Sequence, residues 1–344
     1  MQPTRAQMRW TDAPGARSNS DMVPAASILI VCFNSRAHFP RLKVSLEAQT
    51  APYALYVLDN ASHADERPLA EDFPAHAEIL QSDTNLGFAA ANNRLVELAQ
   101  TEFVALLNPD AFPAPDWLER LLNAATHDTE AAAFGSTQIM ANDETRWDGL
   151  GDCLHVLGPS WRGGHGVARD GLPAREGESF SVCAAAALYR REAWRTIGGF
   201  DESFFCFAED LDLGFRLRLA GWRCVQIADA LVHHVGGAST SSDFSTFHSA
   251  RNGLWAYAKN MPALLYWPLL PAHLALVAAF YLRSFARIDG KAYRRGLRDG
   301  LAALPRLWRT RGAIKRQMRT RDIARVLTWS FSAIVARRVK IISR

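Results

Sequence analysis

The chain has 344 residues, 49% hydrophobic and 22% charged, so a folded core is expected and wholesale disorder is excluded. The net charge of +4 hides an asymmetry, because residues 283–344 carry 18 Lys and Arg against 3 Asp and Glu, and residues 1–282 carry 21 against 32. A mildly acidic body with a strongly basic C-terminal region indicates an anionic partner, either a membrane surface or a nucleic acid.

The N-terminal segment and the cysteines bear on the cellular compartment. Residues 1–24 lack the apolar stretch of a secretory signal, and we interpret them as a flexible polar leader. The cysteines have no CxxC spacing, which argues against a disulfide framework and against a zinc site: Cys32, Cys153, Cys183, Cys206 and Cys224. We therefore expect the part of the chain before the basic region to stay in the cytoplasm.

From residue 27 onward, short apolar runs alternate with helical patterns. Strands are predicted at 27–33, 53–58, 79–80 and 103–107, and helices at 39–49, 89–99 and 116–125. This alternation with short connections predicts a parallel α/β sheet with right-handed crossovers. Ligands of such sheets bind beyond the carboxyl ends of the strands.

Polar residues follow three of these predicted strands directly. Asn34 follows the first strand, Asp59 the second, and the sequence Asn108-Pro109-Asp110 follows the fourth. Asn and Asp also suit turns, which would explain any one of these positions. Three strand ends at one sheet edge favour a binding site instead. Because GxGxxG and GxxxxGK[ST] are absent, a dinucleotide or P-loop site of the usual kind is not predicted.

A long segment, residues 142–179, is rich in Gly and polar residues and contains Trp147 and Trp161. Loops of this length in compact domains are usually functional or disordered. We interpret the segment as a flap over the substrate, and a plain surface insertion is the alternative.

An acidic cluster opens the next predicted helix, which runs to Ala220. Glu209, Asp210 and Asp212 lie in its first turn, where the helix dipole favours negative charge. Alternatively, one of these carboxylates faces the cleft as a general base.

Two histidines end a later predicted strand. His234 precedes a Gly-Gly turn, and with Asp110 at a neighbouring strand end it could hold Mg²⁺ or Mn²⁺, a diphosphate supplying further oxygens. Arg251 could contact that diphosphate, although a lone Arg usually lies on a solvated face.

Together these elements resemble the family 2 glycosyltransferases, and within them the rhamnosyltransferase-like members. The resemblance covers roughly residues 26–260 and rests on Ile30–Asn34, Val57–Ala61, Asn85–Asn93, Leu106–Asp110, Gly198–Asp201, Glu209–Leu213, and His234 with Gly236-Gly237. It implies a GT-A fold, that is, a Rossmann-like, mostly parallel sheet flanked by helices, as a catalytic domain over residues 25–260. It also implies a nucleotide-sugar donor, a divalent metal and inversion at the anomeric carbon.

The resemblance assigns donor and metal positions one by one. Asp59 matches the Asp that hydrogen-bonds the donor's base, and Asn34, Asn85 and Gly87 match positions lining the nucleotide. Asp110 matches the last carboxylate of the metal motif DXD, with Asn108 in place of the first, and His234 matches a His associated with metal or diphosphate.

For the catalytic base, Asp210 matches the family's base and Glu209 is the second choice. The implied reaction moves a sugar, first choice from dTDP-L-rhamnose, to a lipid-linked saccharide in surface polysaccharide synthesis. The alternatives are a UDP-hexose-dependent enzyme of the same fold, a nucleotidyltransferase, a non-catalytic sugar-nucleotide binding subunit, and a nucleic-acid-binding protein. The last is not favoured, because the basic region lacks the signatures of RNA-binding modules.

Residues 261–344 are predicted to be a basic, helical, membrane-associated region. Ala263–Leu282 is uncharged over 20 residues but contains Pro268, Pro271 and His273, which favours a re-entrant or surface-lying hairpin over a span. Thr320–Arg344 carries an apolar stripe typical of an interfacial amphipathic helix: Ile323, Val326, Leu327, Phe331 and Ile334. We expect peripheral or monotopic attachment to the cytoplasmic face of an anionic plasma membrane. Alternatively, these helices pack on the catalytic domain or form a homo-oligomer.

Overall fold

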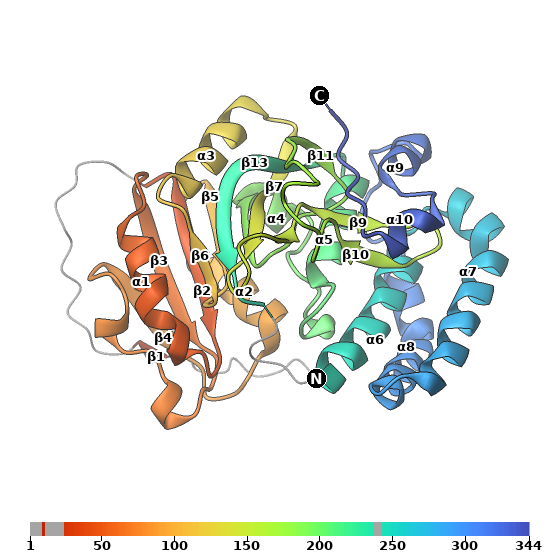
Figure 1. The fold of residues 1–344 in the computed structure, drawn as a ribbon, viewed down its shortest axis with the longest axis horizontal. Helices are drawn as coiled ribbons and strands as arrows, with labels where there is room; N and C mark the ends of the chain where they lie inside the picture. The colour runs from red at the N-terminus through yellow and green to blue at the C-terminus, as the bar shows by residue number, and fades with distance from the viewer. Residues whose placement is uncertain (1–8, 11–23, 237–241, 344) are drawn as a thin grey trace.

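The computed structural model describes residues 9–10, 24–236 and 242–343, and its central feature is one curved mixed sheet covered by helices (Figure 1). The strands are β1 (Arg9–Trp10), β2 (Ala26–Cys32), β3 (Tyr53–Asp59), β4 (Ala77–Gln81), β5 (Phe103–Leu107), β6 (Ala111–Pro113), β7 (Ala131–Met140), β8 (Trp147–Gly149), β9 (Asp152–Leu154), β10 (Ser160–Arg162), β11 (Gly177–Ser179), β12 (Ala186–Arg190) and β13 (Arg223–His234). The α-helices are α1 (Phe39–Glu47), α2 (Gly87–Leu98), α3 (Trp117–His127), α4 (Arg191–Thr196), α5 (Glu209–Leu219), α6 (Ser242–Asn260), α7 (Ala263–Arg283), α8 (Gly290–Thr310), α9 (Thr320–Val326) and α10 (Phe331–Val335).

The sheet has the order β1-β4-β3-β2-β5-β12-β7-β13-β11. Strands β4, β3, β2 and β5 are parallel, β12 runs antiparallel between β5 and β7, and β7 pairs in parallel with β13. The expected GT-A type of α/β sheet is therefore present, and its second half is mixed.

Both faces of the parallel strands are covered, which explains their continuous apolar sequences. Ile28 and Ile30 pack with residues of α1 and α3, whereas Leu29 between them packs with residues of α2, α4 and α5. The predicted strands and helices of residues 27–125 are confirmed, with shifts of one or two residues at most of their ends. Within the predicted leader, Arg9–Trp10 pair antiparallel with β4, so this part joins the sheet, and the other leader residues up to 23 lie outside the described residues.

Residues 142–179 are an ordered part of the fold and no plain surface insertion, and a position over the substrate stays a prediction. They form β8 to β11 and bury Trp147, Leu154 and Trp161. The Trp161 indole donates a hydrogen bond to the carbonyl of Arg338 (3.1 Å), and Glu178 bridges to Ile342. The segment shows no clear strand pattern in sequence because much of its apolar surface is covered by the far C-terminal end of the chain.

The C-terminal helices pack on the catalytic domain. Gly296 on α8 lies so close to the Phe247 carbonyl of α6 that a side chain there would collide with it. One hydrophobic core combines residues from the 142–179 segment, α5, α6, α8 and α9, among them Leu154, Phe215, Trp255 and Leu307. Residues on both sides of position 260 therefore share one core.

Two predictions for the C-terminal region are wrong. Residues 320–344 do not form one amphipathic helix, because α9 and α10 are separate and Ile323 and Leu327 are buried in the protein core instead of facing outward. An apolar stripe does not reveal whether lipid or protein covers it. The uncharged segment is no re-entrant hairpin either: α7 is one continuous helix that contains both Pro268 and Pro271 and lies on the surface of the molecule.

Candidate active site

The strand-end pair expected from the sequence is brought together. Strand β6 follows Asp110 and pairs antiparallel with the end of β13, which places Ala111 opposite His234. As a result, Nε2 of His234 lies 3.4 Å from Oδ1 of Asp110. The other carboxylate oxygen of Asp110 accepts a hydrogen bond from the backbone N–H of Gly236 (3.1 Å).

A third residue, Asp148 on β8, completes this group and was missed from the sequence. Its Oδ2 lies 2.8 Å from Nδ1 of His234, and it also accepts a hydrogen bond from the guanidinium of Arg162. His165 approaches the second carboxylate oxygen at 3.3 Å. Asp148 lies in the Gly-rich segment, where no motif or periodicity distinguishes it from a turn residue.

Electrostatics keep this side of the site ionised. Burial opposes the ionisation of Asp110, but its interactions with His234 and the charge of His38 together outweigh burial and lower the pKa of the carboxyl group. Burial likewise opposes the ionisation of Asp148, and contacts with His165, His234 and Arg162 hold its pKa well below the usual range. Burial opposes protonation of His234, but its contacts with the Asp110 and Asp148 carboxylates together outweigh burial and raise its pKa.

The geometry of this side fits a divalent cation. Within the described chain, the buried Nε2 of His234 has no hydrogen-bond partner, and it faces the Asp110 carboxylate. An imidazole nitrogen and a hard carboxylate oxygen suit Mn²⁺ or Mg²⁺. Among the described residues no group of three or more His, Cys, Asp or Glu could hold a metal ion, so a cation at this place would have at most these two protein ligands.

Asp210 lies at the start of α5 and is partly exposed. Its Oδ2 accepts a hydrogen bond from the backbone N–H of Ala184 (3.1 Å) and its Oδ1 from that of Leu211 (2.8 Å). Burial raises the pKa of Asp210, and the two backbone donors offset the shift only in part. The carboxylate is thus fixed in place and is a stronger proton acceptor than an ordinary Asp.

Two further acids adjoin Asp210. Glu209 is buried, its Oε2 lacks a hydrogen-bond partner within the described residues, and burial together with the Asp210 charge raises its pKa well above the usual value. Asp152, which the sequence did not reveal, faces Arg162 across the β9–β10 hairpin and bonds through its main chain to Ser181. The Ser181 hydroxyl donates to the carbonyl of Asp210 (2.8 Å). Burial and the Asp210 charge raise the pKa of Asp152 to about 7.

The loop that leads into α5 has unusual backbone geometry. Phe205, Phe207 and Ala208 all have positive φ angles, which cost energy for residues other than glycine. Asn252 on α6 holds this loop through hydrogen bonds from its amide nitrogen to the carbonyls of Phe204, Cys206 and Phe207, at 2.7–3.0 Å. The position of the α5 acids therefore depends on α6.

Arg251 is engaged with the same loop. Its guanidinium donates to the Phe204 carbonyl (2.9 Å) and lies 4.4 Å from the centre of the Trp255 ring. The structure thus does not bring Arg251 to Asp110 and His234, and its contact with a diphosphate stays a prediction. The sequence shows that Arg251 is charged, but not that it bonds to the Phe204 carbonyl, because that carbonyl belongs to an irregular loop.

The predicted nucleotide residues at the ends of β2 and β3 are linked to each other. Asn34 has φ 49° and accepts a hydrogen bond from the backbone N–H of His63 (2.9 Å). Asp59 is buried, and its Oδ1 accepts from the backbone N–H of Ser62 (2.9 Å). Its Oδ2 has no hydrogen-bond partner in the described chain and lies 3.9 Å from Nε of Arg67. This oxygen is therefore a buried acceptor whose hydrogen-bonding capacity is not used.

Asn85, Gly87 and Asn108 shape the neighbouring turns. The Asn85 side chain accepts hydrogen bonds from the amide of Asn60 (3.0 Å) and from the backbone N–H of Gly87 (2.8 Å). Gly87 has φ +77°, and a Cβ there would lie 2.5 Å from the Phe205 ring, so only glycine lets α2 meet that loop. The backbone N–H of Asn108 donates to the Ala185 carbonyl (2.7 Å), and its side chain is partly exposed.

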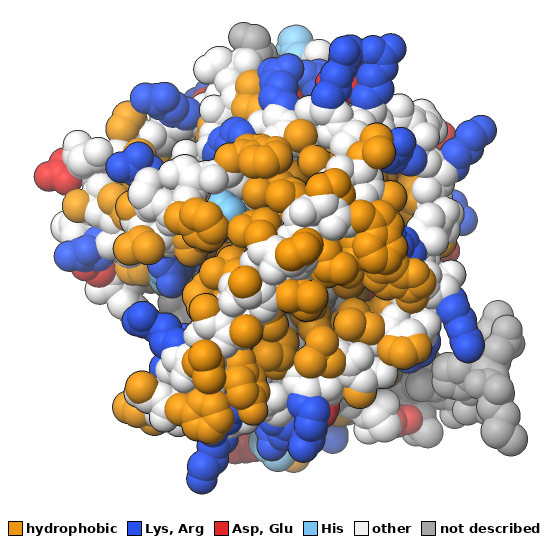
Figure 2. Space-filling view, turned by 90° about the vertical axis from the view of Figure 1, so that its right-hand side faces the viewer, with side chains coloured by type: hydrophobic (Ala, Val, Ile, Leu, Met, Phe, Trp, Pro, Cys, Tyr) orange, Lys and Arg blue, Asp and Glu red, His pale blue; other side chains and the backbone are white. Residues whose placement is uncertain are grey.

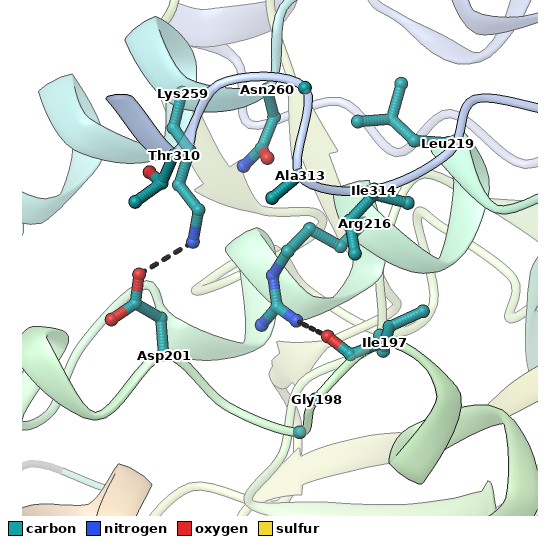
Figure 3. Close-up of a pocket in the computed structure, with 12 residues that line it drawn as sticks. Ile197, Gly198, Asp201, Arg216, Leu219, Lys259, Asn260, Thr310, Ala313 and Ile314 are labelled. Carbon is teal, nitrogen blue, oxygen red and sulfur yellow. Dashed lines mark hydrogen bonds and ion pairs between the residues drawn. The ribbon is translucent and has the colours of Figure 1, made fainter. Parts of the chain in front are cut away.

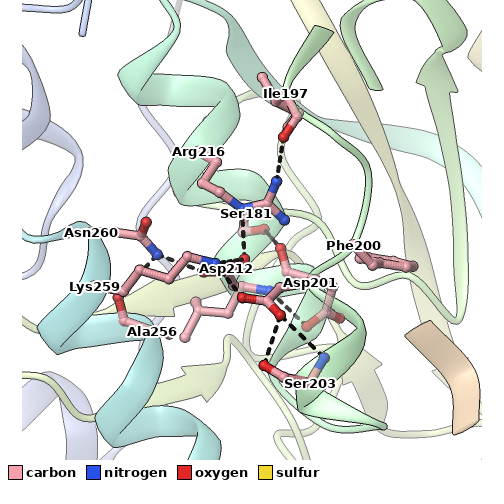
Figure 4. Close-up of polar contacts among 12 residues, drawn as sticks. Ser181, Ile197, Phe200, Asp201, Ser203, Asp212, Arg216, Ala256, Lys259 and Asn260 are labelled. Atoms are coloured by element: carbon pink, nitrogen blue, oxygen red, sulfur yellow. Dashed lines mark hydrogen bonds and ion pairs between the residues drawn. The ribbon is translucent and has the colours of Figure 1, made fainter. Parts of the chain in front are cut away.

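The remaining acid of the cluster, Asp212, has a structural role. It is fully buried and accepts hydrogen bonds from Arg216 on its own helix and from Lys259 and Asn260 on α6 (Figure 4). Lys259 also donates to Asp201 at 2.7 Å. This buried network fixes α5 to α6 and to the turn before it.

A pocket of about 230 Å³ lies next to this network, between the ends of α5 and α6 and the segment after α8 (Figure 3). Its polar lining includes Asp201, Arg216 and Lys259, and Arg216 donates to the Ile197 carbonyl (2.9 Å). None of the predicted site residues lines it. The pocket is therefore distinct from the strand-end site.

Comparisons with known proteins agree with this geometry. The sequence profile described as glycosyl transferase family 2 matches residues 27–198. An N-acetylglucosaminyl-diphospho-decaprenol L-rhamnosyltransferase of Mycobacterium tuberculosis is 30% identical over 249 residues, 65% of this chain and 79% of that protein. The O-antigen biosynthesis protein RfbC of Myxococcus xanthus is 30% identical over 230 residues, 64% of this chain but 18% of that protein.

Two solved structures share the fold. A mannosyltransferase of Pyrobaculum calidifontis in complex with GDP-Man and Mn²⁺ has a TM-score of 0.53 at 19% identity and covers 89% of this chain and 88% of its own. GalNAc-T7 with UDP, GalNAc and Mn²⁺ has a TM-score of 0.55 at 13% identity and covers 70% of this chain and 48% of its own. The expected GT-A fold is thereby confirmed.

Proposed function

Because the chain belongs to glycosyl transferase family 2, it is a glycosyltransferase, and we propose that it transfers a sugar with inversion from a nucleotide-sugar to a lipid-linked saccharide. One observation carries this proposal. Arg162 connects the ionised group of Asp110, His234 and Asp148 to the proton-accepting Asp210. It donates a hydrogen bond to Asp148 and lies opposite Asp152, whose main chain bonds to Ser181, and the Ser181 hydroxyl donates to the Asp210 carbonyl.

In the proposed mechanism, Asp210 removes the proton of the acceptor hydroxyl as that oxygen attacks the anomeric carbon. The two backbone N–H donors orient its carboxylate, and the raised pKa favours proton uptake. Asp110 and His234 would hold a divalent cation, which when bound neutralises charge on the departing nucleoside diphosphate. A single displacement inverts the sugar and needs no second carboxylate as nucleophile.

The proposed donor is dTDP-L-rhamnose, with UDP-hexoses as the alternative. The free Oδ2 of buried Asp59 supports a thymine or uracil base, because both bases offer an imide N–H to a carboxylate acceptor. The mycobacterial relative, whose name gives L-rhamnosyl transfer, supports the sugar.

The proposed acceptor is a glycan on a lipid carrier, and the proposed place of action is the cytoplasmic face of the plasma membrane. Support comes from the same relative, named for an N-acetylglucosaminyl-diphospho-decaprenol, and from α7, an apolar helix on the protein surface. A homo-oligomer remains a prediction.

Thermal denaturation with a panel of nucleotide-sugars, each with and without Mn²⁺, tests the donor and the metal together. A ligand that binds only the native state raises stability by RT ln(1 + [L]/Kd). We expect the largest rise in Tm with dTDP-L-rhamnose plus Mn²⁺. A larger rise in Tm with a UDP-hexose would show that the donor is a UDP-hexose. Equal rises with and without Mn²⁺ would show that donor binding does not need the metal.

A further inference from the structure

The side of the molecule formed by α7 and its neighbours is strongly apolar. Ala263–Ala286 is long and apolar enough to cross a membrane by length and composition, and only 11% of its most apolar window is buried. Figure 2 shows a broad hydrophobic surface on this side, with Lys and Arg around its margin. We call it the α7 face and define it by the exposed large side chains of α7, with Phe285 and Trp308, which contact Tyr281 and Trp267 of that helix: Leu264, Trp267, Leu274, Phe280, Tyr281, Leu282, Phe285 and Trp308. A continuous apolar area of this kind marks an interaction surface.

The helix is attached to the protein at several points along its length. Near its start, Tyr266 is buried. In its middle, His273 is buried, stacks on Tyr257 with ring centres 4.2 Å apart, and bonds to the Leu157 carbonyl (2.8 Å). Directly after its end, Ser284 is buried and its hydroxyl accepts a hydrogen bond from Arg294 of α8 (3.1 Å). If α7 crossed a bilayer, all of these contacts would be lost, including that of an imidazole buried on the protein side.

We propose that the α7 face seats the enzyme on an anionic bilayer with α7 lying in the plane of the membrane, so that the chain does not cross it. A helix of 21 residues is about 31 Å long, so α7 offers an extended apolar strip in this orientation. Trp267 and Trp308 lie together, with ring centres 5.8 Å apart, and tryptophans of this kind favour the membrane–water interface. The membrane contact is argued from the surface alone. Only its link to a lipid-linked acceptor rests on the proposed function.

Charge identifies the kind of bilayer. The residues from 283 onward carry 18 Lys and Arg against 3 Asp and Glu. Exposed cations lie at the end of α7 and shortly after it: Arg283 is its last residue, and Arg287 follows. Basic side chains beside an inserted apolar face attract anionic headgroups, each by about 1 kcal/mol near the surface. In a dimer through this face, the cations of one copy would lie near the same cations of the other. Their repulsion disfavours such a dimer.

The test uses the full chain and point substitutions, because α8 and α9 contribute to the shared core and truncation would expose it. Leu264, Leu282 and Phe285 are 72%, 68% and 65% exposed, so Glu at these positions changes the surface with little effect on folding. Val44→Glu is the matched control, because Val44 on α1 is 66% exposed and lies on the opposite side of the molecule (Figure 1).

Flotation with sealed vesicles of phosphatidylcholine and phosphatidylglycerol measures the bound fraction. We expect wild type and Val44→Glu to float equally, and each of the three substitutions to lower the partition coefficient about tenfold. High salt or vesicles of phosphatidylcholine alone should weaken binding further. Equal flotation of all variants, or dissociation of a wild-type dimer by the same substitutions in vesicle-free buffer, would overturn the proposal.

Sidedness separates lying on the membrane from crossing it. Ile288→Cys, after α7, and Val44→Cys should react with a membrane-impermeant maleimide on the same side of cell-derived vesicles. Reaction on opposite sides would show that α7 spans. Release of nucleoside diphosphate with a short water-soluble acceptor is measured in parallel. If no nucleoside diphosphate is released while the protein floats with vesicles, the proposed function is wrong and the membrane inference stands. If nucleoside diphosphate is released but the protein does not float, only the membrane inference is wrong.

Discussion

The two acidic sides of the site have the same kinds of side chain but opposite electrostatics. Asp110 and Asp148 share a buried imidazole, and their pKa values are lowered. Burial raises the pKa values of Glu209, Asp210 and Asp152, and the Asp210 charge raises those of Glu209 and Asp152 further. Carboxyl groups whose environments separate their pKa values in this way identify which group stays charged and which exchanges a proton. The partners of each carboxylate, and not its residue type, therefore assign its role.

The strongest test of this comparison is Asp210→Asn. Asparagine keeps the shape but cannot accept the proton, so we expect transfer to fall by ~10²–10⁴-fold while donor affinity is kept. Nucleoside diphosphate release in the presence of acceptor measures it. Glu209→Gln is the control and should retain most activity, because Glu209 is buried and its raised pKa keeps it protonated. If Glu209→Gln fails and Asp210→Asn does not, the roles of the two acids are exchanged.

On the ionised side, Asp110→Ala should weaken donor binding more than His234→Ala. Asp110 supplies a charge and a hard oxygen, whereas the imidazole supplies neither. We expect a loss on the order of 10- to 100-fold for Asp110→Ala, by calorimetry with Mn²⁺ or Mg²⁺ present. EDTA should reduce wild type to the level of that variant. Full activity in EDTA would show that Asn108-Pro109-Asp110 forms a turn and has no role in metal binding.

A subtler test addresses Asp148, which orients His234 through Nδ1. Removing a carboxylate behind a metal-binding imidazole typically costs 10- to 100-fold in metal affinity, so Asp148→Asn should lower Mn²⁺ affinity by about this factor. Titration of Mn²⁺ into the protein with dTDP present measures the effect without turnover. Asp170→Asn, an exposed acid of the same segment, should change nothing. Unchanged Mn²⁺ affinity in Asp148→Asn would make Asp148 a purely structural partner.

The smallest expected effect is a shift in the pH profile. As pH falls through the raised pKa of the base, the carboxylate gains a proton and turnover is lost, at a higher pH than for an ordinary Asp. Asp152→Asn removes the acid whose titration is coupled to that of Asp210 and should move this acidic limb to lower pH. Glu176→Gln, an exposed acid nearby in sequence, is the control. A limb that stays in place would show that burial alone raises the pKa of the base.

The parallel half of the fold and part of the site were predictable from the sequence. Strands buried on both faces read as continuous apolar runs, which is why β2 and β5 were located, and the topology then placed Asp110 near His234. Asp148 and Asp152 could not be found in this way. They lie on short strands whose apolar partners are at the other end of the chain, so no local pattern indicates which way they face.

The C-terminal region shows a second limit of sequence analysis. The apolar residues of α7 and of α9 look equally suited to a membrane, yet α7 is exposed and Ile323 of α9 is fully buried. Hydrophobicity reports that a side chain avoids water and not which surface covers it. The burial of α9 depends on contacts with residues far away in the sequence, such as Leu154 and Phe180.

The loop before α5 has a consequence for the response of the enzyme to heat. Phe205, Phe207 and Ala208 each cost on the order of 1–3 kcal/mol in their left-handed conformation, and Asn252 opposes this cost with three hydrogen bonds. The sheet carries no comparable strain, so on warming this loop should rearrange while β2 to β5 remain folded. Asp210 would then leave its position without loss of the fold, and turnover would return on cooling. The upper working temperature of the enzyme would be set by one amide side chain on α6 and not by the melting of its core.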